Sequence, residues 1–409
     1  MICLCYKQQA TNTGFIMNTI PQHLRYLQEE FFPYVEENLG PYTDKHKQLC
    51  QIIAFARPEQ FLSSCKGLVG RPYQDRASIA RSFIAKAVYN LPTTRALIDR
   101  LHCDPVTRRI CGFERSDRLP SEATFSRVFD EFARTDFVSL LQDEFIKRFH
   151  SGSLFEYVSR DSTAISAREK TATKTTNKDM NINTGTSTDQ YTNQPVKAPK
   201  KTGRPKKGEI REPKELSRLK KQTTMSLEAM LADLPKSCDN GCKKNSKGYT
   251  ESWRGYKLHI DSADGDMPIS AILTSASVHD SQVALPLTKI TSGKIHHLYE
   301  LMDSAYDADI IRTEIADSGK VPVIDFNHRS PKDQREFDQC KKERYKNRSS
   351  AERVNGNLKD NFGGCMVRVK GAAKVFTHLM FGLLALAIDQ TLRPHTAAAF
   401  ATTSAATVT

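Results

Sequence analysis

Apolar residues between positions 24 and 150 recur every three or four places along the chain. One such stripe consists of Ala80, Phe83, Ile84, Ala87 and Val88, and the segments 96–101 and 125–132 repeat the same spacing. This is the period of an amphipathic helix with one buried face. Pro120 and Ser121 are residues that begin helices, so we expect a helix start there. The pattern predicts an all-helical N-terminal domain over residues 21–150.

The pattern changes to β-branched residues with short alternation at Leu154, which predicts a strand over 154–165. The segments 255–260 and 267–273 flank a turn rich in Asp and Gly and predict a β-hairpin. A helix over 282–290, a strand over 298–302, a helical run through Ile315 and a strand over 321–326 follow. This order predicts an α/β domain over residues 151–392, in which helices flank a mixed sheet.

Three segments lack periodicity. Residues 167–250 are rich in Thr, Asn, Lys, Pro and Gly, and such a composition buries too little apolar surface to offset the entropy of ordering. We therefore expect a loop-like or partly disordered insertion that interrupts the second domain. Residues 1–20 are predicted to be a disordered extension, with translation starting at Met1 or at Met17, and residues 393–409 a disordered Ala/Thr tail.

The chain carries a formal net charge of +13, which favours a polyanionic partner. Residues 197–221 hold eleven Lys or Arg against three Glu, so most of the excess charge lies in the insertion. Within it, Arg204, Lys206 and Lys207 form a segment that resembles an AT-hook core, which binds the minor groove of DNA. Short basic Pro/Gly segments also occur by chance, which favours a nonspecific phosphate-binding linker over an AT-hook. The helical domain is either a second DNA-binding unit or a plain scaffold.

Cysteine spacing and hydropathy narrow the class of protein further. The ten cysteines are scattered, and neither Cys3/Cys5 nor Cys238/Cys242 has the spacing of a zinc module, so we expect reduced thiols. The apolar stretch at the N-terminus is too short for a signal peptide, and no run of about 18 apolar residues follows. The sequence thus predicts an intracellular protein without a membrane partner.

Two aspartates stand at the ends of predicted strands. Asp161 and Asp303 each follow an apolar strand and precede a serine. Because groups at strand ends line the crevice of an open α/β sheet, we expect the two carboxylates to lie close together. Paired carboxylates suit Mg²⁺ or Mn²⁺ in phosphoryl transfer. An aspartate that follows a strand is, taken alone, more often a turn or cap residue, so the pair needs independent support.

A predicted helix over residues 345–362 presents a polar stripe. Its members, in steps of three and four, are Tyr345, Arg348, Glu352, Asn355 and Lys359. The opposite face carries Ala351, Val354, Leu358 and Phe362, which predicts that one face packs while the other faces a site. An ordinary solvated face with an Arg348–Glu352 ion pair is the alternative.

The spacing Tyr345-x2-Arg348-x3-Glu352-x6-Lys359 resembles the Y-R-E-K signature of the DDE transposases of bacterial insertion sequences. Arg160-Asp161-Ser162-Thr163 and Leu301-Met302-Asp303-Ser304 resemble the family's two aspartate motifs, and the likeness covers most of residues 75–390. The family usually carries a β-rich insertion between its second Asp and its Glu. Here the extra material lies between Asp161 and Trp253, so no hairpin-clamping role is assigned to that tryptophan.

The resemblance implies a ribonuclease-H-like catalytic domain and indicates which residues form its active site. Asp161, Asp303 and Glu352 would be the catalytic residues and the ligands of two Mg²⁺ or Mn²⁺ ions, and Tyr345, Arg348 and Lys359 would contact DNA. The reaction would be cleavage and strand transfer of DNA at terminal inverted repeats and a target site. A homodimer would hold the paired ends at the nucleoid in the bacterial cytoplasm.

Two other functions use the same residues. A ribonuclease-H-like metal-dependent nuclease would share the sheet and the carboxylates without the Y-R-E-K stripe. A catalytically silent DNA-binding derivative of a transposase would keep the basic insertion and tolerate loss of the metal. His279, Asp280, Asp307, Asp309 and Asp325 are rival metal ligands, each of which also suits a cap or a solvated position.

Overall fold

The computed structural model of the chain describes residues 19–39, 41–62, 74–171, 216–244, 248–328, 335–365 and 367–406. Residues 20–150 of this part are helical, which agrees with the period of their apolar positions. Their helices are α2 (Ile20–Tyr26), η1 (Leu27–Phe31), α3 (Phe32–Leu39), α4 (Asp44–Ala56), η2 (Pro58–Phe61), α5 (Arg76–Val88), α6 (Thr94–Cys103), α7 (Pro105–Cys111), η3 (Ser116–Arg118), α8 (Glu122–Arg134) and α9 (Phe137–His150). Ser121 caps α8 as its sequence predicts, because its side chain accepts a hydrogen bond from the Thr124 amide.

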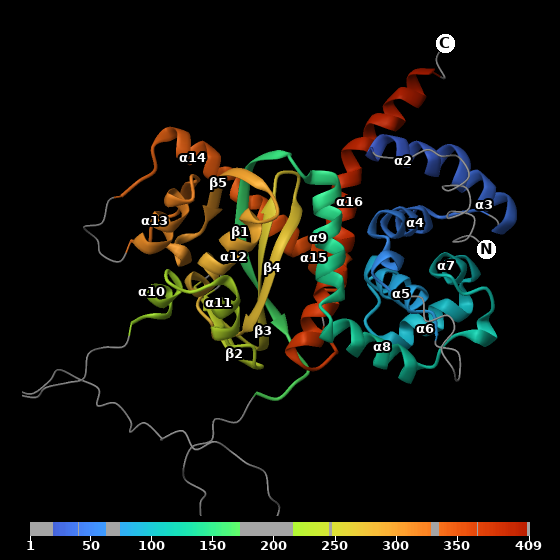
Figure 1. The fold of residues 1–409 in the computed structure, drawn as a ribbon, viewed down its shortest axis with the longest axis horizontal. Helices are drawn as coiled ribbons and strands as arrows, with labels where there is room; N and C mark the ends of the chain where they lie inside the picture. Colours follow the sequence, from blue (N-terminus) through green and yellow to red (C-terminus); the bar gives the residue numbers. More distant parts are fainter. Residues whose placement is uncertain are drawn as a thin grey trace, which may run out of the picture.

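The second half of the chain forms a six-stranded mixed sheet (Figure 1). Its strands are β1 (Leu154–Ser166), β2 (Asp239–Lys244), β3 (Thr250–Ala263), β4 (Met267–Ser275), β5 (His296–Met302) and β6 (Val321–Ile324). β1 pairs antiparallel with β3 and parallel with β5, β5 pairs parallel with β6, and β4 and β2 both pair antiparallel with β3. The predicted hairpin is β3–β4. The fold is α/β and ribonuclease-H-like, as the sequence predicts.

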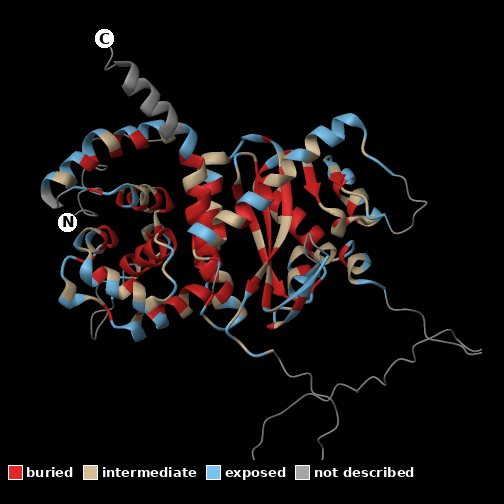
Figure 2. Ribbon diagram, turned by 180° about the vertical axis from the view of Figure 1, so that it is seen from behind, coloured by how far each residue is buried: buried red, intermediate tan, exposed pale blue. Residues whose placement is uncertain are grey.

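Helices cover both faces of the sheet. The connections between parallel strands supply η4 (Asp280–Val283), α12 (Ala284–Ser292), η5 (Ser304–Tyr306) and α13 (Asp309–Asp317). The chain after β6 supplies α14 (Gln339–Tyr345), η6 (Lys346–Arg348), α15 (Ser349–Asn361) and α16 (Ala372–Ala406). α15 packs on β1 and β3, and α16 packs on β4. Figure 2 shows that the strands and the inner part of α16 are buried while the outer helical faces are exposed.

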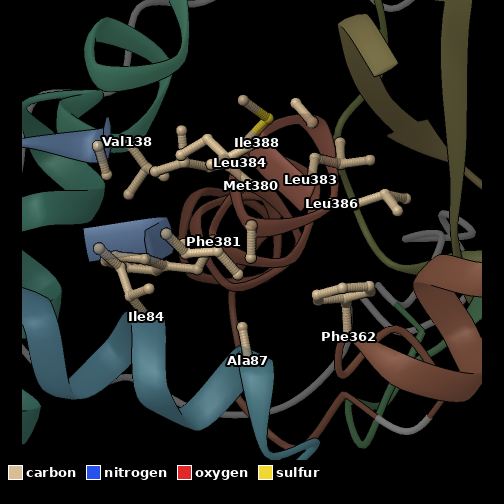
Figure 3. Close-up of a cluster of buried hydrophobic side chains, with 14 of the residues drawn as sticks. Ile84, Ala87, Val138, Phe362, Met380, Phe381, Leu383, Leu384, Leu386 and Ile388 are labelled. Carbon is tan, nitrogen blue, oxygen red and sulfur yellow. The ribbon is translucent and has the colours of Figure 1, made fainter. Parts of the chain in front are cut away.

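One helix, α16, joins the two halves of the protein. It stands between the sheet and the helical region in Figure 1 and contacts β4 on one side and α4, α5, α8 and α9 on the other. Figure 3 shows its side chains Phe381, Leu384 and Ile388 among residues of α5 and α9. Residues 372–394 are long and apolar enough to cross a membrane by length and composition, yet 72% of the apolar window is buried inside the protein. The hydrophobicity of α16 therefore reflects its central position in the core.

Two predicted irregular segments contain regular structure. The insertion over 167–250 includes α10 (Arg218–Gln222), α11 (Leu227–Asp233) and β2. These elements fold because Leu231, Leu234 and their neighbours pack against Val283 and Leu287 of the core. At the other end, α16 continues to Ala406 through the predicted Ala/Thr tail, since alanine has the highest helix propensity.

α16 passes close to the end of α15 at a glycine. A Cβ at Gly382 would lie 2.4 Å from the carbonyl oxygen of Phe362 and 2.8 Å from a methyl group of Leu358. Any side chain at position 382 would push the two helices apart. Gly382 thus fixes the distance between the central helix and the helix that carries Glu352.

A buried lysine links α5 to α16. Lys86 is 5% exposed, and its Nζ lies 3.3 Å from Nδ1 of His378, whose Nε2 donates to the carbonyl oxygen of Gly363 at 2.9 Å. Burial lowers the pKa of Lys86 to about 8, and it lowers the pKa of His378 to about 3, so the imidazole is neutral and accepts from the lysine.

We expect Lys86→Met to raise the free energy of unfolding at pH 7 by about 1 to 3 kcal/mol. The lysine pKa is lower in the folded than in the unfolded chain, so holding the charge costs stability below pH 8. Stability of the parent protein should therefore rise as pH increases from about 8 towards the unfolded pKa, and the variant should lack that rise. Urea unfolding at pH 7 and pH 10 measures both effects, with the exposed Lys289→Met as the control. A less stable Lys86→Met protein at pH 7 would show that the Lys86–His378 bond is net stabilising.

Candidate active site

Asp161 lies in the middle of β1. The sequence pattern had indicated that it lies at the end of the strand. β1 runs on to Ser166 because its antiparallel pairing with β3 continues to Gly255. The parallel pairing with β5 stops earlier, at Ser159 and Leu301. Asp161 therefore stands two residues beyond the last β5 contact, where the sheet opens on that side. The position of Asp161 at the edge of the parallel pairing thus comes from where β5 ends its pairing and not from the end of β1.

Asp303 directly follows β5, as predicted. Its side chain caps the short helix η5, because Oδ1 accepts a hydrogen bond from the Ala305 amide at 3.0 Å. The cap role that the sequence left open is thus real. The other carboxylate oxygen of Asp303, Oδ2, faces Arg348.

The polar stripe lies on a helix that is interrupted. Tyr345 ends α14, Arg348 ends the 3₁₀ turn η6, and Glu352, Asn355 and Lys359 belong to α15. The prediction of one continuous α-helix over 345–362 was wrong at Lys346–Arg348. The backbone nevertheless keeps right-handed helical angles through Arg348 (φ −57°, ψ −26°), so the chain direction continues through a tighter turn.

The three carboxylates converge on one guanidinium. Nη2 of Arg348 lies 3.6 Å from Oδ1 of Asp161 and 3.6 Å from Oδ2 of Asp303, and Nη1 lies 2.7 Å from Oε1 of Glu352. β1, the end of β5 and α15 thus each supply one acid. Three carboxylates against one cation leave a net charge of −2. The Arg348–Glu352 pair that sequence reasoning kept as an alternative is present, and it is part of this larger cluster.

Burial sets the proton affinities of the aspartates. It raises the pKa of Asp161 to about 6, against the opposing effect of Arg348 and with further repulsion from Asp303 and Asp280. The pKa of Asp303 is raised for the same reason. A further cation would relieve the unbalanced charge of the two aspartates.

The donor set fits hard divalent cations. Carboxylate oxygens are the ligands that Mg²⁺ and Mn²⁺ prefer, and the three acids already surround a cation, the guanidinium of Arg348. Within the described ranges no group of three His, Cys, Asp or Glu side chains could hold a metal ion as it stands. The guanidinium lies between the acids, so Arg348 would have to swing aside for ions to reach all three.

A buried ionic network holds the strands from the other face of the sheet. Arg160, 1% exposed, makes two bonds of 2.7 Å to Asp261 of β3 and lies 3.5 Å from Glu300 of β5. Its Nη1 also donates to the Ala284 carbonyl and to Thr288 of α12. Adjacent strand residues point to opposite faces, so Arg160 lies directly behind Asp161. Sequence reasoning treated it only as part of a motif.

Three of the four rival acids have other partners in the structure. Asp280 pairs with Lys257 at 3.0 Å, and Asp307 pairs with Arg312 at 2.8 Å and with Arg335 at 3.3 Å. Asp325 accepts from the Phe326 amide, and Asp309 opens α13. His279 caps η4, as predicted.

Some of the predicted DNA-binding residues lie within the described part of the chain, and the others lie outside it. Lys359 is half-buried, and its pKa is lowered by burial and by the charge of Lys243. Tyr345 packs on Phe337 with ring centroids 5.2 Å apart, and burial raises its pKa to about 12. Arg204, Lys206 and Lys207 lie outside the described residues.

Comparison with known proteins gives two matches. The family described as Transposase DDE domain matches residues 161–388, which is more than half of the chain, and the Transposase domain (DUF772) matches residues 36–131. The first begins at Asp161 and includes Asp303 and Glu352. No curated protein and no solved structure matched the chain in the same comparisons.

Proposed function

The chain belongs to the DDE transposase family, and on that basis we propose that Asp161, Asp303 and Glu352 are its catalytic acids. Metal-dependent cleavage and strand transfer of DNA is the general activity of this family, and this protein is a transposase of the insertion-sequence type. The observation that supports the assignment is the convergence of three acids from three separate elements on one cation.

In this proposal the three acids hold two Mg²⁺ or Mn²⁺ ions. Such ions would activate the attacking water or 3′-hydroxyl and stabilise the leaving oxygen of an in-line displacement. The protein itself orients the acids: β3 and Arg160 fix the strand of Asp161, and η5 fixes the backbone after Asp303. The excess negative charge of the cluster would favour the uptake of cations.

Arg348 and Lys359 would neutralise phosphate oxygens next to the scissile bond. Arg348 is suited to this because a guanidinium binds two phosphate oxygens at once. If ions took its place among the acids, its side chain would be free to turn towards the DNA. Tyr345 would donate a hydrogen bond to a phosphate or stack on an exposed base. The basic segment with Arg204, Lys206 and Lys207 would add salt-dependent affinity for DNA.

The partners in this proposal are the terminal inverted repeats of the element and a target DNA, held by a homodimer that pairs the two ends at the bacterial nucleoid. A hydrolytic nuclease would use the same acids but would join no strands. The catalytically silent derivative is disfavoured because all three acids are present and face one another.

A plasmid assay separates the three functions. The purified protein is incubated with DNA that carries the flanking repeats of its own element, a supercoiled target plasmid and Mg²⁺ or Mn²⁺. We expect cleavage at the repeat ends and covalent joining of the ends to the target. Cleavage without joined products would support the nuclease, and binding without cleavage in both metals would support the silent derivative.

A further inference from the structure

Two hydrogen bonds attach the helix of Glu352 to the strand of Asp161. Oγ of Ser159 donates to the carbonyl oxygen of Arg348 at 3.0 Å, and Nδ2 of Asn355 donates to Oδ2 of Asp161 at 3.0 Å. One bond lies before Glu352 in the chain and the other lies after it. Together they set the position of α15 along β1, and only the second one reaches a catalytic acid.

Asn355 is buried but only half satisfied. The residue is 7% exposed, and its Oδ1 has no hydrogen-bond partner. Reversing the amide would place Oδ1 against the carboxylate of Asp161, so chemistry fixes the orientation with Nδ2 towards the acid. Leucine has a similar size and would fill the same space with no unpaired atom. A packing role alone would therefore not require the amide.

The bond gives the two oxygens of Asp161 different surroundings. Oδ2 accepts from Asn355, while Oδ1 faces Nη2 of Arg348 at 3.6 Å. A carboxylate held at one oxygen cannot rotate freely, so its other oxygen keeps its direction towards the guanidinium of Arg348, which also contacts Asp303 and Glu352. Side chains that orient a metal ligand in this way commonly change metal affinity or activity by 10- to 100-fold when they are lost.

We propose that Asn355 is a positioning residue, which holds Asp161 in the orientation needed to bind a divalent cation. This rests on the proposed role of Asp161 as a metal ligand. Asn355 does not touch the reacting DNA in this assignment and acts through Asp161 alone. The competing role, simple docking of α15 on the sheet, would require the contact for stability but not for metal affinity.

Asn355→Leu and Asn355→Ala both remove the amide donor, and the first also keeps the packing volume. The matched control is Asn357→Leu on the same helix, since Asn357 bonds Asn361 and not an active-site acid. Mn²⁺ binding is measured by calorimetry on the full-length protein without DNA, and the melting temperature is measured in EDTA. Single-turnover cleavage and its half-saturating DNA concentration complete the test.

We expect Asn355→Leu and Asn355→Ala to bind Mn²⁺ about 10- to 100-fold more weakly, with a similar loss in cleavage rate and an unchanged half-saturating DNA concentration. Asn357→Leu should stay within about twofold of the parent affinity, a change well below that range. Parent-like Mn²⁺ affinity in both Asn355 variants would overturn the proposal, and so would loss of the fold in EDTA by both. A parent protein that binds no Mn²⁺ would instead refute the proposed function.

Discussion

Asp161→Asn should reduce DNA strand cleavage at least about a thousandfold while leaving DNA binding nearly unchanged. The substitution keeps the size of the side chain and removes one of the charges that would hold the ions. Glu352→Gln should have a comparable effect, because its carboxylate belongs to the same cluster. Cleavage of repeat-end DNA under single-turnover conditions measures the rate, and fluorescence anisotropy in EDTA measures the binding.

A substitution on α13 serves as the matched control for this loss of cleavage. Asp317→Asn removes an exposed carboxylate at the end of that helix, which is not part of the cluster, and the variant should cleave at the parent rate. If Asp161→Asn retains more than about a tenth of the parent rate, less than 1.4 kcal/mol of transition-state stabilisation has been lost. Asp161 would then not be a metal ligand, and the assignment of the site would be wrong.

Arg160→Met should lower the free energy of unfolding by about 3 to 5 kcal/mol. The substitution leaves Asp261 fully buried without its bidentate cation and removes the guanidinium that lies 3.5 Å from Glu300. Removing one partner of a buried ion pair is costly because the remaining charge cannot be solvated. Urea denaturation followed by circular dichroism gives the size of the effect.

The double variant Arg160→Met/Asp261→Leu separates charge from packing. An apolar pair in place of the ion pair leaves no stranded charge at these two positions, so the double variant should recover at least about 2 kcal/mol of the loss. If the single substitution costs less than about 1 kcal/mol, water reaches the network and Arg160 does not hold the strands together.

Much of the fold could be predicted from the sequence because its signals are local. The alternation in β3 and β4 and the Asp–Gly turn between them specify the hairpin, and Ser121 specifies the start of α8. α16 has no such signal. Its residues 375–388 are apolar on nearly every side, since they pack on the sheet and the helical region at once. An all-round apolar pattern carries no period to predict from.

The candidate site was partly predictable for a related reason. The stripe from Tyr345 to Lys359 follows helical spacing, so Glu352 could be placed from sequence alone. Asp161 was placed at a strand end because the sequence does not show that β3 extends the pairing of β1 beyond β5. The contacts of Arg160 with Asp261 and of Asn355 with Asp161 join residues 101 and 194 positions apart. Such pairings depend on tertiary structure, which local patterns do not encode.

The most direct test of the catalytic assignment is a crystal structure of the protein with Mn²⁺, analysed by anomalous scattering. We expect two Mn²⁺ peaks roughly 3.5 to 4 Å apart between the carboxylates of Asp161, Asp303 and Glu352, with the guanidinium of Arg348 turned out of the cluster. Peaks elsewhere, for example beside Asp280 or Asp307, or no peak between the three acids at saturating Mn²⁺, would contradict the assignment.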